Sequence, residues 1–437
     1  MKNKLSIYSL LLICLPFGRL SAQQKLSLQD AITIALQNNY NIKLSNNESE
    51  IAENNLSYAN SAFLPSITGN LNDINNIQTT QVDLANGETR EATNAKSSNL
   101  NYGVSLNWKI FDGFKMFADY NQVQELEKLG NLNAQITVQT TIADVIEAYY
   151  NLASQKKQLA SLQTALEVSM IRLKNAKSRY TLGKGSKLEL LAAKVDLNTD
   201  TTQLLMQQDQ IKTGKINLNQ LMSRDLQTDF DIDEDILIDR SLIYQNLKTL
   251  VDTQSPDLKT AEINKKISEI YVKQVKANRF PVISLISGYN FAKSTSPPTG
   301  FALRSKNRGF NYGLTASINI FNGFQQNRSE KNAKLSLDNA ILDLERIKQD
   351  IDAQLLTSFQ SYQTSLQLIA LEEKNVEVAE ENLNITLEKY KLGSIVPLEL
   401  REAQRNYMNA NARYANALYQ AKISEITLKE ITGTISL

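Results

Sequence analysis

The sequence has no histidine and a single cysteine, Cys14, among 437 residues. The commonest metal ligand and the commonest general base of proteins are therefore missing. A Ser–His or Cys–His nucleophile pair cannot be assembled, and a disulfide within the chain is excluded. We accordingly predict a protein that is not an enzyme, with no catalytic site, no metal site and no cofactor.

Proline and glycine are also scarce, and neither sign of charge is in excess. Seven prolines and 16 glycines leave most of the chain free to be helical. Lysine and arginine number 47 against 46 aspartates and glutamates, which argues against nucleic-acid binding through bulk positive charge. Beyond the N-terminus there is no uninterrupted apolar run of about 18 residues, so we predict no helical membrane anchor.

Residues 1–22 are predicted to be a secretory signal peptide. Two lysines precede an apolar stretch from Leu5 to Leu15, and Ser21-Ala22 offers a cleavage site between small residues. Ile13 stands before Cys14, where a lipoprotein signal requires a small residue, so we do not expect lipidation of Cys14. The mature chain would then be exported without any thiol.

The strongest pattern is an internal repeat. NYGVSLNWKIFDGF at 101–114 matches NYGLTASINIFNGF at 311–324, an offset of 210 residues. RYTLGKGSKLELLAA at 179–193 matches KYKLGSIVPLELREA at 389–403 at the same offset. A constant offset over such a distance indicates two copies of one large structural unit. We predict three segments of the mature chain: a first repeat at 23–225, an acidic linker at 226–240 and a second repeat at 241–437.

Each repeat is predicted to contain a helix, two strands, a long helix, a turn and a returning helix. Ser27 is expected to cap the first helix, which would run to about Phe63, and its equivalent would cover about 241–280. Pro65 and Pro281 mark the change from helix to strand. The predicted strands are about 66–74, 101–111, 282–292 and 311–321, and the predicted helical hairpins are 114–223 and 324–432.

The predicted strands alternate strictly between apolar and polar residues. One face of the second strand is apolar and the other polar, with Tyr102, Val104, Leu106, Trp108 and Ile110 opposing Asn101, Gly103, Ser105, Asn107 and Lys109. Such alternation over about ten residues is typical of a transmembrane barrel strand with lipid outside and water inside. A half-buried sheet of a soluble protein is the alternative. The polar stretches 72–99 and 293–308 are predicted to be solvent-facing loops.

The hairpins carry long heptad repeats. Apolar residues recur every seven positions in the first helix of each hairpin, at Leu152, Leu159, Leu166, Leu173 and Tyr180, and at Tyr362, Ile369, Val376, Leu383 and Tyr390. Heptads sustained over this length predict supercoiled helix packing. A helix over about 114–181 would be about 100 Å long at about 1.5 Å per residue, which excludes a compact globule.

Four strands are too few to close a membrane barrel, because the smallest barrels of this kind have about eight. Unpaired strand edges in hydrocarbon leave backbone groups unsatisfied at a cost of several kcal/mol each. We therefore predict that copies of the chain associate. Two copies would give eight strands, three twelve and four sixteen, and the number stays open at this point.

The duplicated plan, the IF[DN]GF block after the second strand of each half and the Y-x-L-G turn blocks resemble the TolC family of outer-membrane efflux proteins. The resemblance implies an α+β membrane protein that forms a homotrimer. Its twelve-stranded transmembrane β-barrel, four strands per chain, would contact outer-membrane lipid and continue into a long α-helical coiled-coil tunnel in the periplasm. An exported structural coiled-coil scaffold or surface protein without channel activity is the alternative.

The resemblance also implies a function and partners. The chain would be a channel of the cell outer membrane that gives substrates a passive exit. It would dock to a periplasmic adaptor (membrane fusion) protein and to an inner-membrane transporter, either a proton-driven RND or an ATP-driven ABC protein, in a tripartite efflux pump or a type I secretion system. Nothing in the sequence indicates the exported substrate or which of the two transporter classes applies.

Two glutamates are implied as a gate at the periplasmic entrance. Counted from Tyr390 and Gly393 of the second turn, Glu399 and Glu402 occupy the positions where the family has an acidic ring. They are three residues apart and share a helical face. Six carboxylates around a narrow opening would favour cations and bind divalent ions. The alternative is that they are ordinary exposed glutamates near a helix N-terminus, where the helix dipole favours them.

A latch between the two hairpins is implied as well. Tyr390 stands at the family's tyrosine position and Glu189 at its acidic position, but Ile395 stands where an arginine is expected. Only a tyrosine–carboxylate hydrogen bond therefore carries over. The turns are expected to supply glycines with a permissive backbone and leucines that contact an adaptor: Gly183, Gly393, Leu182 and Leu392.

Overall fold

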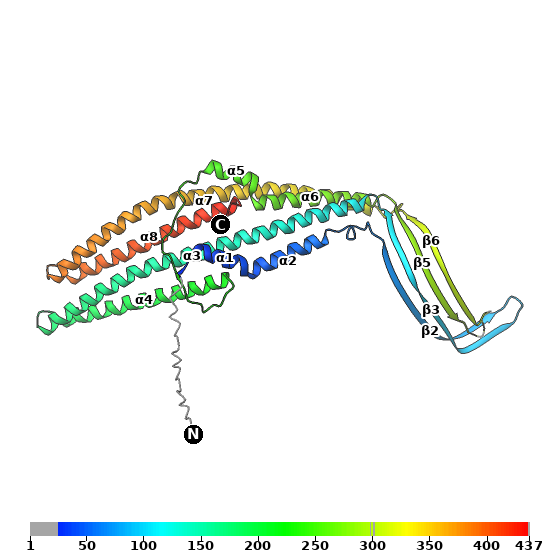
Figure 1. Ribbon diagram of the computed structural model, residues 1–437, viewed down its shortest axis with the longest axis horizontal. Coiled ribbons are helices and arrows are strands. Elements are labelled where there is room, and N and C mark those ends of the chain that lie inside the picture. Colours follow the sequence, from blue (N-terminus) through cyan, green and yellow to red (C-terminus); the bar gives the residue numbers. More distant parts are fainter. Residues whose placement is uncertain (1–24, 298, 300–301, 436–437) are drawn as a thin grey trace, which may run out of the picture.

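The structure is a computed structural model and describes residues 25–297, 299 and 302–435. The predicted signal peptide at 1–22 lies outside these residues. The chain forms an elongated body in which long helices occupy one end and a four-stranded sheet the other (Figure 1). The helical hairpins are α3 with α4 and α7 with α8, and α2 and α6 lie between the middle of the molecule and the sheet.

The elements follow one another in the same order in the two halves. The first half contains β1 (Lys25–Leu26), α1 (Leu28–Asn38), α2 (Tyr40–Asn55), β2 (Ser66–Asp83), β3 (Thr89–Phe111), α3 (Lys115–Thr181) and α4 (Lys187–Leu221). The second contains β4 (Asp231–Ile232), α5 (Tyr244–Gln254), α6 (Pro256–Ala277), β5 (Val282–Thr295), β6 (Arg304–Ser317), α7 (Gln325–Lys391) and α8 (Pro397–Ile431). Helices α3 and α7 both have 67 residues, and α4 and α8 both have 35.

The helix that opens each half is broken, which corrects the single helices expected over 28–63 and 241–280. Asn39 has a non-helical backbone, with φ −55° and ψ 129°, and its side-chain oxygen accepts hydrogen bonds from the N–H groups of Asn41 and Ile42, so it starts a new helix. In the second half Ser255 is the break, because Pro256 disfavours a helical conformation at the residue before it. The first half's helices also end at Asn55, earlier than expected.

The strands differ from expectation in length. The predicted loop at 72–99 is mostly strand, since β2 continues to Asp83 and β3 begins at Thr89, and the loop at 293–308 shrinks in the same way. Polar residues can form these strands because pairing gives the backbone N–H and C=O groups their hydrogen-bond partners, and the side chains can stay exposed on both faces. Strand β6 ends at Ser317, earlier than the predicted 321. The expected linker at 226–240 contains β4, which pairs in parallel with β1.

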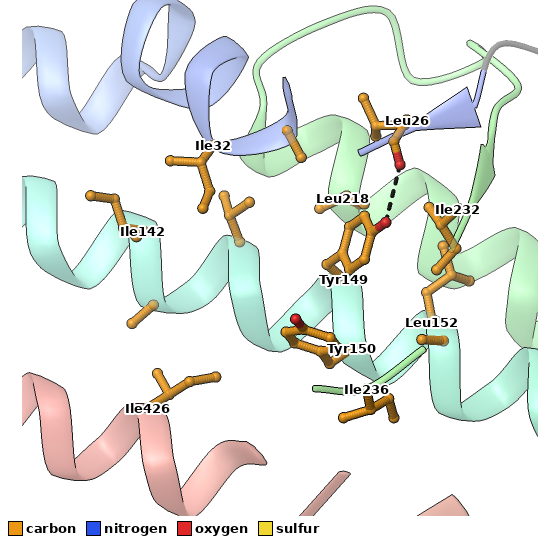
Figure 2. Close-up of a cluster of buried hydrophobic side chains, with 14 of the residues drawn as sticks. Leu26, Ile32, Ile142, Tyr149, Tyr150, Leu152, Leu218, Ile232, Ile236 and Ile426 are labelled. Atoms are coloured by element: carbon orange, nitrogen blue, oxygen red, sulfur yellow. Dashed lines mark hydrogen bonds between the residues drawn. The ribbon is translucent and has the colours of Figure 1, made fainter. Parts of the chain in front are cut away.

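The hydrophobic core lies in the middle of the helical part, where both hairpins meet the N-terminal segment (Figure 2). The Tyr149 hydroxyl donates a hydrogen bond of 3.1 Å to the Leu26 carbonyl and accepts one of 3.2 Å from the Asp233 N–H. Ile426 of α8 and Ile236 of the linker lie in the same cluster. These contacts join the start of the chain, the linker and both hairpins into one body.

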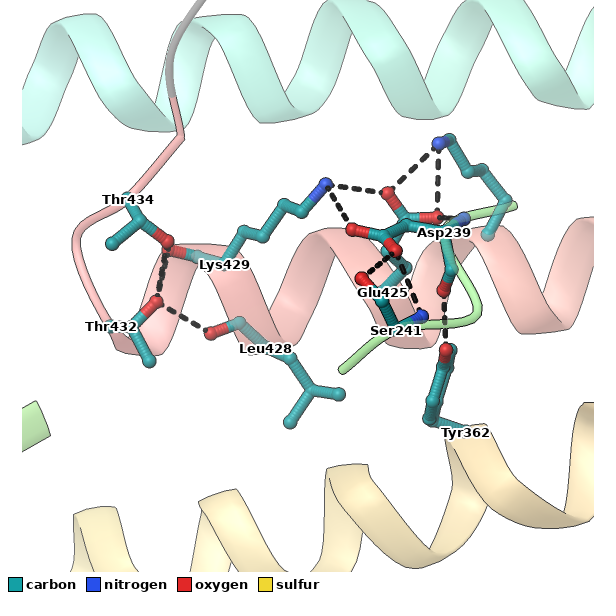
Figure 3. A network of polar contacts seen from close by, with 9 residues as sticks. Asp239, Ser241, Tyr362, Glu425, Leu428, Lys429, Thr432 and Thr434 are labelled. Atoms are coloured by element: carbon teal, nitrogen blue, oxygen red, sulfur yellow. Dashed lines mark hydrogen bonds and ion pairs between the residues drawn. The ribbon is translucent and has the colours of Figure 1, made fainter. Parts of the chain in front are cut away.

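A polar network fixes the end of the linker onto α8 (Figure 3). The Glu425 carboxylate, 2% exposed, accepts hydrogen bonds from the Asp239 N–H at 2.9 Å and from Lys429 Nζ at 2.7 Å. Lys422 Nζ donates to the same carboxylate at 3.0 Å, and the Tyr362 hydroxyl of α7 donates to the Asp239 carbonyl. The buried negative charge is thus compensated by two cations.

The sheet is antiparallel with the order β2-β3-β5-β6, so β2 and β6 are its edges. Its apolar face is largely exposed, most of all on the edge strands, with Leu71 75%, Leu314 68% and Tyr312 80% exposed. An exposed apolar surface of this extent marks a site of contact with a partner or with lipid. Among the helices formed by the described residues, none is both long and apolar enough to cross a bilayer.

Candidate functional site

The tips of the two hairpins lie at the same end of the molecule, opposite the sheet (Figure 1). Both turns have the same backbone geometry. Gly183 and Gly393 adopt φ values of +71° and +75°, and the next residue's N–H closes each turn by donating to the carbonyl of Arg179 at 2.8 Å or Lys389 at 3.0 Å. Glycine is favoured here because a Cβ is strained at positive φ.

Each tip presents two exposed leucines. Leu182 and Leu392 are 72% and 81% exposed. Leu188 and Leu398, at the first turn of the returning helices, are 77% and 74% exposed and were not singled out from the sequence. They occupy matching positions in the two halves, 210 residues apart, which is the signal that could have identified them.

The two glutamates expected at the entrance, Glu399 and Glu402, are exposed at the start of α8. Glu399 lies in the first turn of the helix, where the dipole favours a negative charge. Glu402 is 61% exposed at its side chain and lies 3.9 Å from Arg405, a surface pair that contributes little. Among the described residues of one chain, neither glutamate belongs to a group of three or more side chains that could hold a metal ion.

Tyr390 is buried rather than displayed at the tip. It is 3% exposed and packs with Val168, Leu383, Leu400 and Ala403. Burial raises the pKa of its hydroxyl, and the nearby negative charge of Glu189 raises the pKa further, so the hydroxyl stays protonated at neutral pH.

The hydrogen bond expected between Tyr390 and Glu189 is not formed within the chain. The Tyr390 hydroxyl and the Glu189 Oε1 are both buried without a hydrogen-bond partner among the described residues. Glu189 is instead drawn toward Arg179, at 3.6 Å, because a guanidinium attracts a carboxylate more strongly than a phenol does. The structure thus brings the two residues into the same neighbourhood without joining them.

A buried ionic network lies farther from the tip and joins both hairpins. Asp200 of α4, 1% exposed, accepts hydrogen bonds at 2.8 and 2.9 Å from Arg401 of α8. Asp196 of α4 pairs with Arg172 of α3 and lies 3.7 Å from Arg401. Arg401 therefore connects the second hairpin to two carboxylates of the first.

An uncharged part completes this network. Gln404 is fully buried, and its Nε2 donates to the Ala165 carbonyl at 2.5 Å, to Ser169 at 2.9 Å and to Asp200 at 3.0 Å. Ser169 itself donates to Asp200 at 2.5 Å. We call Ser169, Arg172, Asp196, Asp200, Arg401 and Gln404 the inter-hairpin network.

Sequence reasoning missed the inter-hairpin network. The resemblance implies an arginine at position 395, where this chain has Ile395. The arginine that contacts the first hairpin is Arg401, six residues later. A signal was available in the repeat, because Asp200 aligns with Ala410 and Arg401 with Leu191 at the offset of 210. A charged residue that aligns with an apolar residue of the other repeat marks a polar contact specific to one hairpin.

The pattern that defines the outer membrane efflux protein family matches residues 31–224 and 249–434. The chain belongs to this family. It is 21% identical to the outer membrane protein TolC of Escherichia coli K12 over 79% of this chain and 72% of TolC. It is 20% identical to the outer membrane efflux protein BepC of Brucella suis biovar 1 over 95% of this chain and 88% of BepC.

Solved structures agree on the fold. The Campylobacter jejuni CmeC outer membrane channel superposes with a TM-score of 0.79, at 18% identity over 93% of this chain and 85% of that one. The protein is thus a TolC-like channel protein of the outer membrane and not an enzyme. The family resemblance, the outer-membrane localisation and the expectation of a protein that is not an enzyme are confirmed.

Proposed function

We propose that this outer membrane efflux protein assembles as a homotrimer and gives substrates of a tripartite efflux pump or a type I secretion system a passive exit. The proposal rests on one observation. In the single chain, both the sheet and the layer of long helices end in elements that have a neighbour on one side only. The sheet ends in the open edges β2 and β6. The helical part ends in α4 and α7, which are the outer members of the lateral order α7-α8-α3-α4 (Figure 1).

The outer helices carry apolar surface that the single chain leaves exposed. On α7, Leu371, Val378 and Ile385 lie seven residues apart and are 55%, 66% and 49% exposed. On α4, Val195 and Leu205 are 63% and 60% exposed. Apolar residues that recur every seven positions on a helix pack against a second helix. We infer that α7 of one copy packs against α4 of the next copy.

Head-to-tail contacts of this kind generate a ring when the rotation closes. Closure is required at the sheet, because an open edge in hydrocarbon leaves backbone groups unsatisfied. Three copies give a twelve-stranded barrel above a helical tunnel, as the resemblance implies. In this arrangement the repeats at 23–225 and 241–437 contribute equivalent sectors of the ring, joined by the linker at 226–240.

The partners we propose follow from the tips. Four exposed leucines per chain, at 182, 188, 392 and 398, would contact the periplasmic adaptor, because exposed apolar clusters mark interaction sites. The energy source would be an RND or ABC transporter in the inner membrane. In this proposal the transporter supplies the energy and the duct itself is passive.

The assembly is tested by extracting the protein from outer membranes with mild detergent. We expect an oligomer on a gel that converts to monomer on heating, and stepwise conductance when it is added to planar lipid bilayers. A monomer recovered in buffer without detergent would refute the channel. An oligomer of two or four chains by mass measurement would refute the trimer alone.

We further propose that Glu399 and Glu402 ring the tunnel entrance. Replacing both by alanine should lower the cation-to-anion permeability ratio in planar bilayers and abolish block by millimolar divalent cations, because the ring of carboxylates is lost. The matched control is the double alanine variant of Glu380 and Glu381, exposed on α7 away from the tip. If the double variant and the control had equal reversal potentials, Glu399 and Glu402 would not form the gate.

Tyr390 and Glu189 would add a closed-state contact at the same entrance. Each bears a buried oxygen that makes no hydrogen bond among the described residues, and a hydrogen bond between them would satisfy both at once while Arg179 stays 3.6 Å from Glu189. Tyr390→Phe should then raise the conductance of the resting channel in the same recordings. An unchanged conductance would leave Tyr390 as a packing residue.

A further inference from the structure

The end of the sheet remote from the helices carries four cations, which we call the basic cluster: Lys293 of β5 and Arg304, Lys306 and Arg308 of β6. All four side chains are exposed. None forms an ion pair or a side-chain hydrogen bond within the part of the chain that the structure describes. Four unneutralised charges on two adjacent strands indicate a binding partner of the opposite sign.

Strand register places the basic cluster on the apolar face. Residues directly opposite each other on neighbouring strands share a face of the sheet. Arg308 is opposite Phe291, which is opposite Tyr102, and the rings of Phe291 and Tyr102 stack at 4.9 Å. The cations therefore begin in the row where the aromatic residues of the apolar face end. That boundary is the level of the membrane interface in transmembrane barrels.

Lys293 and Lys306 are themselves directly opposite each other. Like charges in this position repel and destabilise a strand pair. The cost disappears when an anion bridges the two ammonium groups, and Arg308 in the adjacent row offers a guanidinium fork that fits phosphate oxygens. The arrangement is thus suited to a phosphate group.

An apolar depression of about 380 Å³ adjoins the basic cluster on the same face. It exists because Gly69 of β2 has no side chain, and a Cβ there would meet no atom within 4 Å. Its walls are formed by Leu71, Tyr102, Val104, Tyr289 and Phe291. The apolar depression suits the acyl chain of a lipid, and the neighbouring Lys293, Lys306 and Arg308 suit its anionic headgroup.

We propose that this surface binds a phosphorylated lipid of the outer leaflet, with an acyl chain in the depression and a phosphate held by Lys293, Lys306 and Arg308. The inference rests on the proposed function, because the apolar face must lie in the membrane with the helices on the periplasmic side. Asp73 could pair with these cations in place of a lipid phosphate. It lies in the same row of the sheet as Lys293, but on the edge strand β2. In a ring, the Asp73 of the next copy would lie on the strand beside β6.

The test uses lipid A, a lipid with two phosphates, added to the delipidated oligomer and counted by native mass spectrometry. We expect the triple variant Lys293→Gln, Lys306→Gln and Arg308→Gln to bind lipid A at least about tenfold more weakly than the natural protein. A matched control removes three exposed lysines elsewhere, with Lys273→Gln, Lys334→Gln and Lys348→Gln, and should bind normally. Dephosphorylated lipid A should bind the natural protein as weakly as lipid A binds the triple variant.

Equal binding by the triple variant and the control, or equal binding of the dephosphorylated lipid, would overturn the proposal. It would also be wrong if the triple variant and Asp73→Asn both lowered the dissociation temperature of the oligomer without lipid, since the cluster would then pair with a neighbouring copy. These outcomes are distinct from failure of the proposed function, in which the natural protein itself would form no detergent-stable oligomer.

Discussion

Replacing Arg401 by methionine should destabilise each chain by about 3–5 kcal/mol and raise the conductance of the resting channel. The reason is that Asp200, 1% exposed, would keep its charge without the guanidinium that lies 2.8 Å away. Arg401 also connects α8 to the first hairpin, so its loss frees the second tip to move outward. The measurements are the temperature at which the purified oligomer unfolds and single-channel conductance in planar bilayers.

The control is Arg405→Met, one turn along the same helix. Arg405 is 61% exposed and, among the described residues, its one ion pair is a surface contact with Glu402, so its loss should cost less than about 1 kcal/mol and change conductance far less than the loss of Arg401. The double variant Arg401→Met with Asp200→Leu removes both charges and should regain most of the stability but not the low resting conductance. If Arg401→Met behaves like Arg405→Met in both measurements, the inter-hairpin network does not hold the hairpins together.

A second large effect is expected in the sheet, where Gly103→Ala should reduce the yield of folded oligomer by about tenfold or more. A Cβ at position 103 would lie 2.5 Å from the Tyr289 carbonyl oxygen and 2.5 Å from the Asn290 side chain. The backbone cannot yield without separating β3 from β5. The measurement is the fraction of heat-modifiable oligomer in outer-membrane extracts.

Gly309→Ala provides a control in the same row of the sheet. Gly103 and Gly309 are both paired with Asn290, on its two sides, yet a Cβ at Gly309 would meet no atom of its own chain within 4 Å. The Gly309 variant should therefore assemble like the natural protein. Equal yields from the two variants would show that the close approach of β3 and β5 is not required for the barrel.

The sequence predicted the type and order of most elements because they depend on local periodicity. Heptads such as Leu152 to Tyr180 require a long helix whatever lies beside it, and strict alternation around Val104 requires a strand. The boundaries were less accurate where the pattern was weak. The polar stretch 72–99 was interpreted as a loop, yet backbone pairing carries β2 and β3 through most of it.

The candidate site was predicted only in part. The turns repeat visibly in the sequence, so Leu182 and Leu392 could be assigned to the tips by counting. The partner of Glu189 could not be assigned in this way. It depends on the distance between two hairpins, and within the chain Arg179 at 3.6 Å takes the place expected for Tyr390.

The sequence by itself determined that this protein has two hairpins and two-faced strands, too few to close a barrel, because side-chain periods are properties of neighbouring residues. Only the tertiary structure decided that Asp200 meets Arg401 and that Lys293 faces Lys306. Asp200 and Arg401 are 201 residues apart in the chain. Their contact is fixed by how far one helix slides along another, and that displacement is set by side-chain packing over the whole length of the hairpins.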